Sequence, residues 1–361
     1  MKAAILRQAN TPLSFEDVEF DKPGPREVLI DTKACGVCHS DLHFIDGKYP
    51  YAMPVIPGHE AAGVVRAVGS DVVSMAPGDH VVTCLSAYCG RCEFCVTGRI
   101  SLCQDPSTKR AQDATPRMAQ KGEIVHQLLN VSGFAEQMLV HENAAVAITR
   151  DMPFDRAALL GCAVVTGAGA VFHAANVRPG EYVAVVGAGG VGLAVVNAAK
   201  IAGAAKIIVI DPVESKREFA RKLGATHGFD PSNEDMKSEI AELTGGGVHH
   251  AIEAVGLIET GQTCVALLRR GGMATMLGMM PLNRERIGLD AIELLSEKKI
   301  QGSVMGSNKF PLDIPRLAQF YLDGQLDLDT IIAERVPLGE INGALDKLRQ
   351  GDSVRSVIVF E

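Results

Sequence analysis

The chain has 361 residues, of which 47% are apolar and 22% charged, a balance that is typical of globular proteins and excludes a disordered or collagen-like chain. Asp and Glu number 43 against 35 Lys and Arg, giving a net charge of -8, and without a basic stretch a nucleic-acid-binding protein is not expected. At roughly 150 residues per domain, this length predicts two domains.

The N-terminal third predicts short strands separated by Pro and Gly turns. Strands are expected over residues 28–34 and 63–69, and a turn followed by a strand over 77–83. Residues 109–127 are polar and irregular, which indicates a surface loop or an insertion.

From about residue 180 the pattern changes to alternating strands and helices. Strands are expected at 182–187, 206–211, 227–229, 248–254, 272–277 and 300–304, and helices at 191–202, 214–223, 233–243, 258–268 and 291–295. This alternation predicts an α/β fold with a parallel, doubly wound sheet. The tail adds two helical segments and a last strand, 354–360, and we expect it to return to the first domain.

Two stretches without charged residues, 157–177 and 182–199, approach the length of a membrane span. Both are rich in Gly and Ala and include the polar residues Thr166, His173 and Asn197, so neither is expected to cross a membrane.

The chain has nine cysteines, five of them between Cys84 and Cys103. An odd, clustered set argues against a secreted disulfide framework. No signal-peptide pattern follows Met1, because Arg7 ends a short apolar run. The sequence therefore predicts a cytoplasmic, reduced protein whose cysteines bind metal.

A dinucleotide fingerprint, Gly187-Ala-Gly189-Gly-Val-Gly192, lies between an expected strand and an expected helix. Asp211 ends the next strand and could accept hydrogen bonds from ribose hydroxyls, which favours NAD over NADP. The alternative is a structural Gly-rich turn in another α/β fold.

Four cysteines form a ladder, C-x2-C-x2-C-x7-C, whose spacing suits a closed structural zinc site. They are Cys89, Cys92, Cys95 and Cys103. An iron–sulfur cluster is the main alternative. A zinc-ribbon nucleic-acid module is disfavoured by the net charge.

A second group of titratable residues runs from Cys35 to His43, followed by His59, Glu60 and the isolated Cys162. Two thiolates and one imidazole would bind a zinc ion with one open position, as catalytic zinc requires. The residues alone do not choose between Cys35 and Cys38, or between Cys162, Cys84 and Cys264.

Taken together, these motifs resemble the zinc-dependent medium-chain alcohol dehydrogenase family over essentially the whole chain. The matching stretches are Cys35-Gly-Val-Cys38-His-Ser-Asp, Gly58-His59-Glu60, the cysteine ladder, Leu160-Gly-Cys162-Ala-Val-Val-Thr166-Gly, the glycine fingerprint and Ser353-Val-Arg355-Ser.

The resemblance implies a role for each matching residue. The catalytic zinc ligands would be Cys38, His59 and Cys162, with Glu60 beside the metal, Asp41 as the hydrogen-bond partner of His59, and structural zinc on the ladder. Proton transfer would use Ser40 and His43. Coenzyme contacts would come from His39, Thr166, Gly187, Gly189, Gly190, Val191, Gly192, Asp211, Lys216 and Arg355. Cys35, Cys84 and Cys264 match no ligand position and are expected to pack. His249 and His250 are interpreted as structural.

The implied fold is a Rossmann sheet plus a mainly β, partly open (GroES-like) barrel. Residues 1–160 and 305–361 would form the catalytic domain with both zinc sites, and 161–304 the NAD-binding domain, with the active site in the cleft between them. Segment 109–131 matches no family pattern that we can place.

The implied function is NAD⁺-dependent, reversible oxidation of alcohols to aldehydes or ketones, with two zinc ions per chain and a homodimer or homotetramer. Leu85 resembles a wall position of the alcohol pocket, which favours an apolar alcohol. The alternatives are a zinc-free quinone or enone reductase on the same fold, and a zinc- or NAD-binding protein without catalysis.

Overall fold

The computed structural model describes residues 1–111, 113–280, 282, 286–351 and 355–361. The chain forms two compact units. The first contains Met1–Ala163, Lys309–Gly324 and Ile331–Glu361, and the second contains Val164–Asn308 and Gln325–Thr330. Relative to the expected division, residues 161–163 lie in the first unit, and residues 305–308 and 325–330 in the second. The first difference matters, because it places Cys162 in the same unit as Cys38 and His59.

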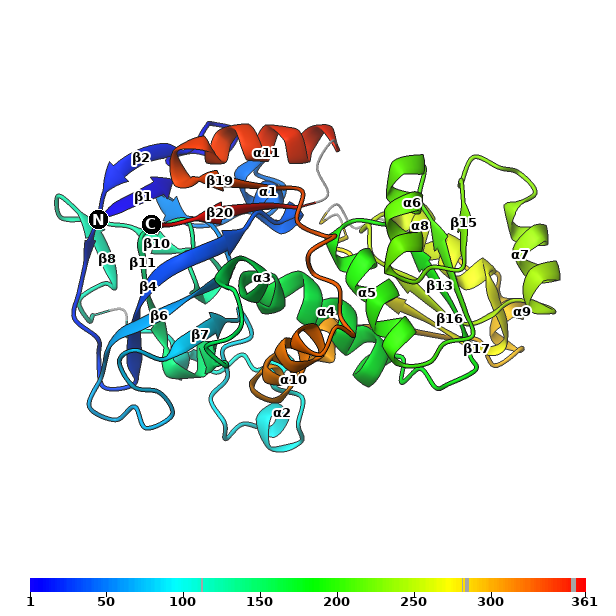
Figure 1. Ribbon diagram of the computed structural model, residues 1–361, viewed down its shortest axis with the longest axis horizontal. Coiled ribbons are helices and arrows are strands. Elements are labelled where there is room, and N and C mark those ends of the chain that lie inside the picture. The colour runs from blue at the N-terminus through cyan, green and yellow to red at the C-terminus, as the bar shows by residue number, and fades with distance from the viewer. Residues whose placement is uncertain (112, 281, 283–285, 352–354) are drawn as a thin grey trace. The chain divides into compact units, whose positions relative to one another are not determined.

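The first unit is mainly β (Figure 1). Its seven-stranded sheet has the order β12(Ala145–Ala147), β7(His80–Thr83), β6(Glu60–Val68), β4(Glu27–Gly36), β20(Ser356–Val359) and β19(Glu334–Pro337), with β11(Gln137–His141) also paired to β4. Smaller sheets join β1(Lys2–Ile5) to β2(Ser14–Asp17), β5(Val55–Ile56) to β10(His126–Gln127), and β3(Glu19–Phe20) to β8(Met118–Gln120) and β9(Glu123–Ile124). Its helices include α1(His39–Ile45), α2(Glu93–Val96), α10(Phe310–Leu322) and α11(Ile341–Gln350).

Strand pairing between β4 and β6 prepares the site in the first unit. The antiparallel register sets Gly36 opposite Glu60 and Cys35 opposite Ala61. Consequently, the residues just after β4 and just before β6 lie at the same end of the sheet. The C-terminal strand β20 pairs with β4 at the same place, with Val357 opposite Gly36, so the tail belongs to this unit.

The second unit is a six-stranded parallel sheet in the order β15(His227–Phe229), β14(Lys206–Ile210), β13(Tyr182–Val186), β16(Val248–Glu253), β17(Leu268–Met276) and β18(Lys299–Gly302). The connecting helices are α5(Gly190–Ile201), α6(Glu214–Leu223), α7(Met236–Thr244), α8(Ile258–Ala266) and α9(Ala291–Leu294). When these six strands are numbered 1 to 6 along the chain, their order across the sheet is 3-2-1-4-5-6, which is the order of a Rossmann fold. The expectation of a parallel doubly wound sheet is confirmed.

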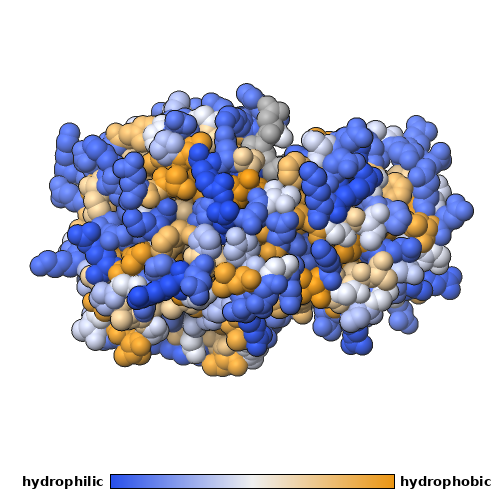
Figure 2. All heavy atoms as spheres, in the orientation of Figure 1, coloured by the Kyte–Doolittle hydropathy of each residue, from blue (hydrophilic) through white to orange (hydrophobic). Residues whose placement is uncertain are grey.

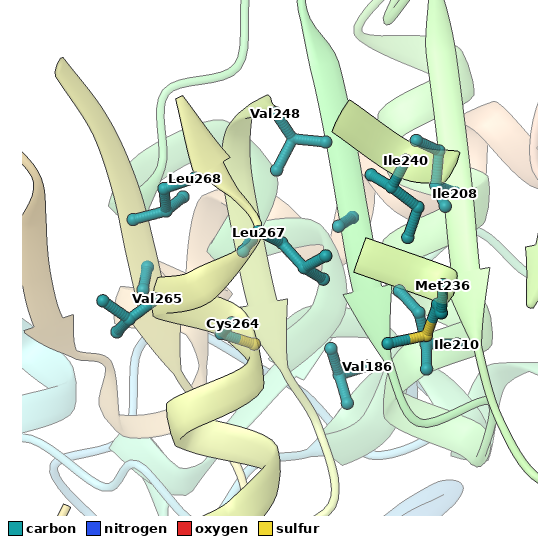
Figure 3. Packing of buried hydrophobic residues seen from close by; sticks show 13 residues of the cluster. Val186, Ile208, Ile210, Met236, Ile240, Val248, Cys264, Val265, Leu267 and Leu268 are labelled. Carbon is teal, nitrogen blue, oxygen red and sulfur yellow. The ribbon is translucent and has the colours of Figure 1, made fainter. Parts of the chain in front are cut away.

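Apolar side chains from α7 and α8 cover one face of this sheet (Figure 3). Met236 and Ile240 of α7 pack with Ile208 and Ile210, and no more than 4% of any of these side chains is exposed. Burying one such side chain contributes about 1.5–3 kcal/mol. Cys264 lies fully buried in the same cluster, as expected for a packing cysteine.

One helical run, Phe154–Ala174, is long and apolar enough to cross a membrane by length and composition, but 83% of its most apolar window is buried inside the protein. It consists of α3(Phe154–Leu159) and α4(Val165–Gly169), each followed by a π-helical turn.

On the face drawn in Figure 2, apolar residues are scattered among hydrophilic ones.

Segment 109–131 is more ordered than the expected loop, since it contains β8, β9 and β10. Two of its arginines, Arg110 and Arg117, donate to the carboxylate of Glu27 at 2.5 and 2.7 Å. Burial would raise the pKa of Glu27, but the two guanidinium groups outweigh it and hold that pKa at about 2. An ionised, buried Glu27 therefore anchors the segment to β4.

Candidate active site

Three predicted metal ligands meet in the first unit. Cys38 precedes α1, His59 precedes β6, and Cys162 lies in the π-helical turn Leu160–Val164. Their ligand atoms all lie within 4.8 Å of one another, and all three residues are buried. Wide helical turns of this kind are frequent at functional sites, because they redirect a side chain out of the regular helix.

Asp41 fixes the orientation and tautomer of His59. Its Oδ1 lies 3.0 Å from His59 Nδ1 and accepts from the Gly58 N–H at 3.0 Å, and its Oδ2 accepts from the Cys38 N–H at 3.3 Å. A carboxylate can only accept here, so the proton of His59 belongs on Nδ1. Among the described residues the buried Nε2 has no hydrogen-bond partner, which leaves a lone pair beside the two thiols. This donor set fits a metal ion.

Glu60 lies beside the same group. Its Oε1 accepts from the Ala163 N–H at 2.8 Å, and its Oε2 is 3.1 Å from Arg355 Nη1. Burial raises the pKa of Glu60 to about 7, although Arg355 opposes that rise. Gly36 makes room for this carboxylate, since a Cβ at Gly36 would lie 2.1 Å from Glu60 Oε2.

Arg355 is buried, with 4% exposed, and donates to the Val37 carbonyl at 2.9 Å. The pKa of the Cys38 thiol is lowered, first by its hydrogen bond with Cys162 and further by the neighbouring His59 and Arg355. The structure thus places Arg355 beside the candidate metal ligands Cys38, His59 and Cys162. The expected contact of Arg355 with a coenzyme pyrophosphate stays a prediction. Ser353, from the same motif, lies outside the described residues.

The cysteine ladder folds into a second cluster of ligands. The four Sγ atoms of Cys89, Cys92, Cys95 and Cys103 lie within 4.8 Å of one another. Sulfur–sulfur distances of 3.4, 3.8 and 3.9 Å match the edge of about 3.8 Å in a tetrahedron of thiolates around one zinc ion. A [4Fe–4S] cage, in which each cysteine ligates a different iron, needs a wider spacing. The geometry favours one ion.

The expected proton-transfer residues lie on α1. Ser40 and His43 are three residues apart and therefore share a face of the helix. His43 is half-buried, and its Nδ1 has no hydrogen-bond partner among the described residues. Burial, and after it the charge of the neighbouring His39, lowers the pKa of His43. His39 itself is exposed, and its ring centroid is 5.8 Å from that of His43.

The fingerprint occupies the turn between β13 and α5 in the second unit. Gly187 has φ +98°, and a Cβ at Gly192 would lie 1.8 Å from the Gly187 carbonyl, so both positions require glycine. Around Gly189, by contrast, no atom lies within 4 Å of a Cβ position, which leaves space for a phosphate group. Gly190 and Val191 follow in the first turn of α5, whose N-terminus favours anions.

Asp211 follows β14 and is 7% exposed. Its oxygens accept from the Ala188 N–H at 2.8 Å and the Val213 N–H at 2.9 Å, which ties it to the fingerprint turn. Each oxygen keeps a further lone pair for a ribose hydroxyl. Lys216 is partly buried in α6, and Thr166 is buried with its hydroxyl 3.5 Å from Met305 Sδ.

Three further groups contribute to the two sites and carry no motif in the sequence. The Ala163 N–H donates a hydrogen bond to Glu60, and the lack of a side chain at Gly36 leaves room for the Glu60 carboxylate. Glu253, fully buried at the end of β16, accepts from the Val255 and Gly256 N–H groups beside the fingerprint turn. Its position at the end of a buried strand was the available signal.

Two family models match the chain. The model "Alcohol dehydrogenase GroES-like domain" matches residues 24–150, and "Zinc-binding dehydrogenase" matches residues 190–321. Among curated proteins, the NDMA-dependent alcohol dehydrogenase of Amycolatopsis methanolica is 36% identical over 99% of this chain and 98% of its own length.

Two solved structures are similar over the full chain. The alcohol dehydrogenase zinc-binding domain protein of Burkholderia ambifaria has a TM-score of 0.95 and 35% identity, covering 100% of this chain and 98% of its own. Benzyl alcohol dehydrogenase of Acinetobacter calcoaceticus has a TM-score of 0.94 and 33% identity, covering 100% and 99%.

Proposed function

The chain belongs to the zinc-dependent medium-chain alcohol dehydrogenase family, and we propose that it catalyses the reversible, NAD⁺-dependent oxidation of an alcohol to an aldehyde or ketone. The observation that carries the proposal is the buried group of Cys38, His59 and Cys162, in which Asp41 orients the imidazole. We further propose two zinc ions per chain, one in this group and one in the cysteine ladder.

Zinc bound by Cys38, His59 and Cys162 would supply Lewis-acid polarisation of the substrate oxygen, and NAD would supply the hydride acceptor. The residues of the chain prepare this chemistry. Asp41 keeps the proton of His59 on Nδ1, so that Nε2 stays available as a ligand. Ser40 would accept the proton of the alcohol while releasing its own hydroxyl proton into a relay that ends at His43, and His43 would pass a proton to solvent.

Coenzyme choice rests on Asp211 in this proposal. Its carboxylate would accept hydrogen bonds from ribose hydroxyls and repel a 2′-phosphate. Since one relative is named for dependence on NDMA, turnover should be measured with free NAD⁺, with NADP⁺ and with NDMA present.

We propose an apolar alcohol as the substrate. Leu85 is partly buried, and Asn130 of segment 109–131 donates to its carbonyl at 3.1 Å, which fixes this wall position. The likeness to benzyl alcohol dehydrogenase supports testing benzyl alcohol before aliphatic alcohols.

The test combines elemental analysis with NADH formation from a panel of alcohols. We expect two zinc ions per chain in the wild type, and one zinc ion and no turnover in Cys38→Ser. The matched control is Cys35→Ala, which removes a neighbouring buried thiol outside the metal group and should retain both ions and activity. Iron in the protein, or turnover that survives Cys38→Ser, would overturn the proposal.

A zinc-free quinone or enone reductase is the alternative function. The assembled set of three buried ligand atoms argues against it, because such a reductase has no use for a metal site. Enone reduction by metal-free protein would favour it. A zinc- or NAD-binding protein without catalysis would show zinc but no turnover with any alcohol in the panel.

We also propose a cytoplasmic location, because reducing conditions keep all nine cysteines free to act as ligands or core residues. A homodimer or homotetramer is proposed as the assembly, and light scattering after gel filtration tests it.

A further inference from the structure

A cavity of about 290 Å³ lies in the second unit, away from the fingerprint turn. Its lining comes from the residues that precede β13, the first half of β17 and the starts of β16 and β18. It includes His249, His250, Arg269, Arg270 and Lys299. Because the sheet is parallel, these residues lie at the amino ends of the strands, whereas Gly187 follows the carboxyl end of β13. Five residues of β13 separate the two ends, about 16 Å.

Two hydrogen-bond donors face each other in this cavity. The Tyr182 N–H donates to His249 Nδ1 at 3.0 Å, and a backbone N–H can only donate, so the proton of a neutral His249 must be on Nε2. Burial and then Arg269 lower the pKa of His249, which keeps it neutral. Yet His249 Nε2 lies 3.0 Å from Arg269 Nη1, and a guanidinium also only donates. A ligand that accepts hydrogen bonds from both groups would remove this conflict.

His250 supplies a second unsatisfied group. It is 8% exposed, lines the cavity, and pairs through Nε2 with Glu181 Oε2 at 2.8 Å. Its buried Nδ1 has no hydrogen-bond partner in the part of the chain that the structure describes. Because a carboxylate only accepts, Nε2 is the donor nitrogen here, and Nδ1 of the neutral ring can only accept a hydrogen bond. Leaving a buried polar atom unpaired costs about 1–3 kcal/mol in general, so Nδ1 points to a donor such as an ordered water or a hydroxyl of the ligand, and not to an oxygen of an anion.

The charge of the lining is strongly unbalanced. Arg178, Arg269, Arg270 and Lys299 line the cavity together with a single carboxylate, Glu181. Within the described part of the chain, the side chains of Arg178, Arg270 and Lys299 pair with no carboxylate, and all three are exposed. In a chain of net charge -8, such a cationic hollow attracts anions from solution.

We propose that this cavity is an oxyanion site that binds a phosphate group, either free phosphate or the phosphate of a small metabolite, independently of the coenzyme. The anion accepts hydrogen bonds from His249 Nε2 and from the guanidinium of Arg269, which suits the several oxygens of a phosphate. Arg178, Arg270 and Lys299 surround it with positive charge. The volume exceeds what one phosphate fills, which leaves room for a small organic group.

Calorimetric titration of the zinc-loaded, NAD⁺-saturated protein tests the proposal, because saturation with NAD⁺ blocks the coenzyme site. The probes are inorganic phosphate and glycerol phosphate in a phosphate-free buffer. We expect one saturable site per chain, and binding at least tenfold weaker in Arg269→Gln, because a hydrogen-bonded charge is lost. Tighter binding of glycerol phosphate identifies a metabolite site, and equal binding identifies a phosphate site.

Lys237→Gln is the matched control, since Lys237 is exposed on α7 outside the cavity and should bind phosphate as the wild type does. Thermal unfolding separates a ligand role from a structural one. Without phosphate, Arg269→Gln should unfold at the wild-type temperature or above it, because the contact between two donors is removed. Phosphate should raise the unfolding temperature of the wild type but not of the variant.

If Arg269→Gln fails to fold, the same titration is performed with Lys299→Gln and with Arg270→Gln. Each of these variants should bind phosphate severalfold more weakly than the wild type. Absence of phosphate binding in the wild type, or equal binding in Lys237→Gln and Arg269→Gln, would overturn the proposal. So would nitrogen NMR of labelled histidine that places the proton of His249 on Nδ1.

Discussion

Replacing Asp41 by asparagine removes the charge that holds His59 and changes almost nothing else in shape. In the native protein, one oxygen of Asp41 accepts hydrogen bonds from His59 Nδ1 and the Gly58 N–H, and the other accepts one from the Cys38 N–H. An asparagine can keep its oxygen toward His59 and Gly58, but its amide then faces the Cys38 N–H, so two donors meet. The reverse orientation sets the amide against two donors.

The first orientation costs less, because it leaves only the buried Cys38 N–H without an acceptor, at a cost of about 1–3 kcal/mol. Loss of the carboxylate also makes the imidazole a weaker ligand. Removing the hydrogen-bond partner of a metal-binding histidine typically lowers metal affinity 10–100-fold. For Asp41→Asn we therefore expect zinc to bind about 10–100-fold more weakly in the group of Cys38, His59 and Cys162, which corresponds to about 1.4–2.7 kcal/mol.

Competition with a chromophoric chelator measures this affinity directly. The cysteine ladder acts as an internal reference, since its four ligands form a separate group, and its zinc should stay bound. The matched control is Asp46→Asn, at the end of the same helix, where the carboxylate pairs with Arg349 on the surface. Unchanged affinity in Asp41→Asn, or equal loss of both zinc ions, would refute the reasoning.

Four further expectations follow from the same geometry. Cys95→Ser should retain one zinc ion and melt at a lower temperature, because structural zinc contributes directly to folding; an unchanged melting curve would contradict this. Glu27→Gln should lower the free energy of unfolding by about 3 kcal/mol at pH 7, measured by circular dichroism in urea. The folded pKa of Glu27 lies below the unfolded one, so its stabilisation is present above about pH 4.5 and is lost as the pH falls toward 2; a difference independent of pH would refute the assignment. Asp211→Ser should raise the KM for NAD⁺ and narrow the preference over NADP⁺, and a wild type that uses both coenzymes equally would disprove that role. Ser40→Ala should be nearly inactive, whereas His43→Gln should lower kcat about tenfold to a hundredfold. Added imidazole should restore part of the kcat of His43→Gln, and its dependence of kcat on pH should differ from that of the wild type. An unaltered pH profile without rescue by imidazole would mean that Ser40 passes its proton directly to solvent.

The local signals in the sequence were sufficient for the second unit. Each strand and helix there has its own periodicity and its own turn residues, and chain order with short connections leads to one parallel sheet. For the same reason the fingerprint was readable: Gly187, Gly189 and Gly192 act within one turn, where sequence neighbours are also neighbours in space. The cysteine ladder is equally local.

The site in the first unit needed the tertiary structure. From the residues alone, Cys35 and Cys38 were equivalent, as were Cys162, Cys84 and Cys264. Folding separates them, because β4 turns Cys35 into the core, while Cys38 follows the strand and meets a residue more than a hundred positions away. Only a resemblance to known proteins could choose between them in advance.

The same distinction applies to His249 and His250, which the sequence left as structural residues of a strand. The pattern of a strand predicts which residues point to each face of the sheet, but it does not predict which groups from neighbouring strands lie against them. Parallel pairing brings Tyr182 and Arg269 to His249, and that juxtaposition, between residues 20 and 67 positions apart, creates the unmatched donors. The sequence by itself determined the elements, the fingerprint and the ladder, since each is set by neighbours along the chain. The ligand set, the partners of Asp41 and the cationic cavity were decided only by the tertiary structure, because long-range strand pairing selects which distant side chains meet.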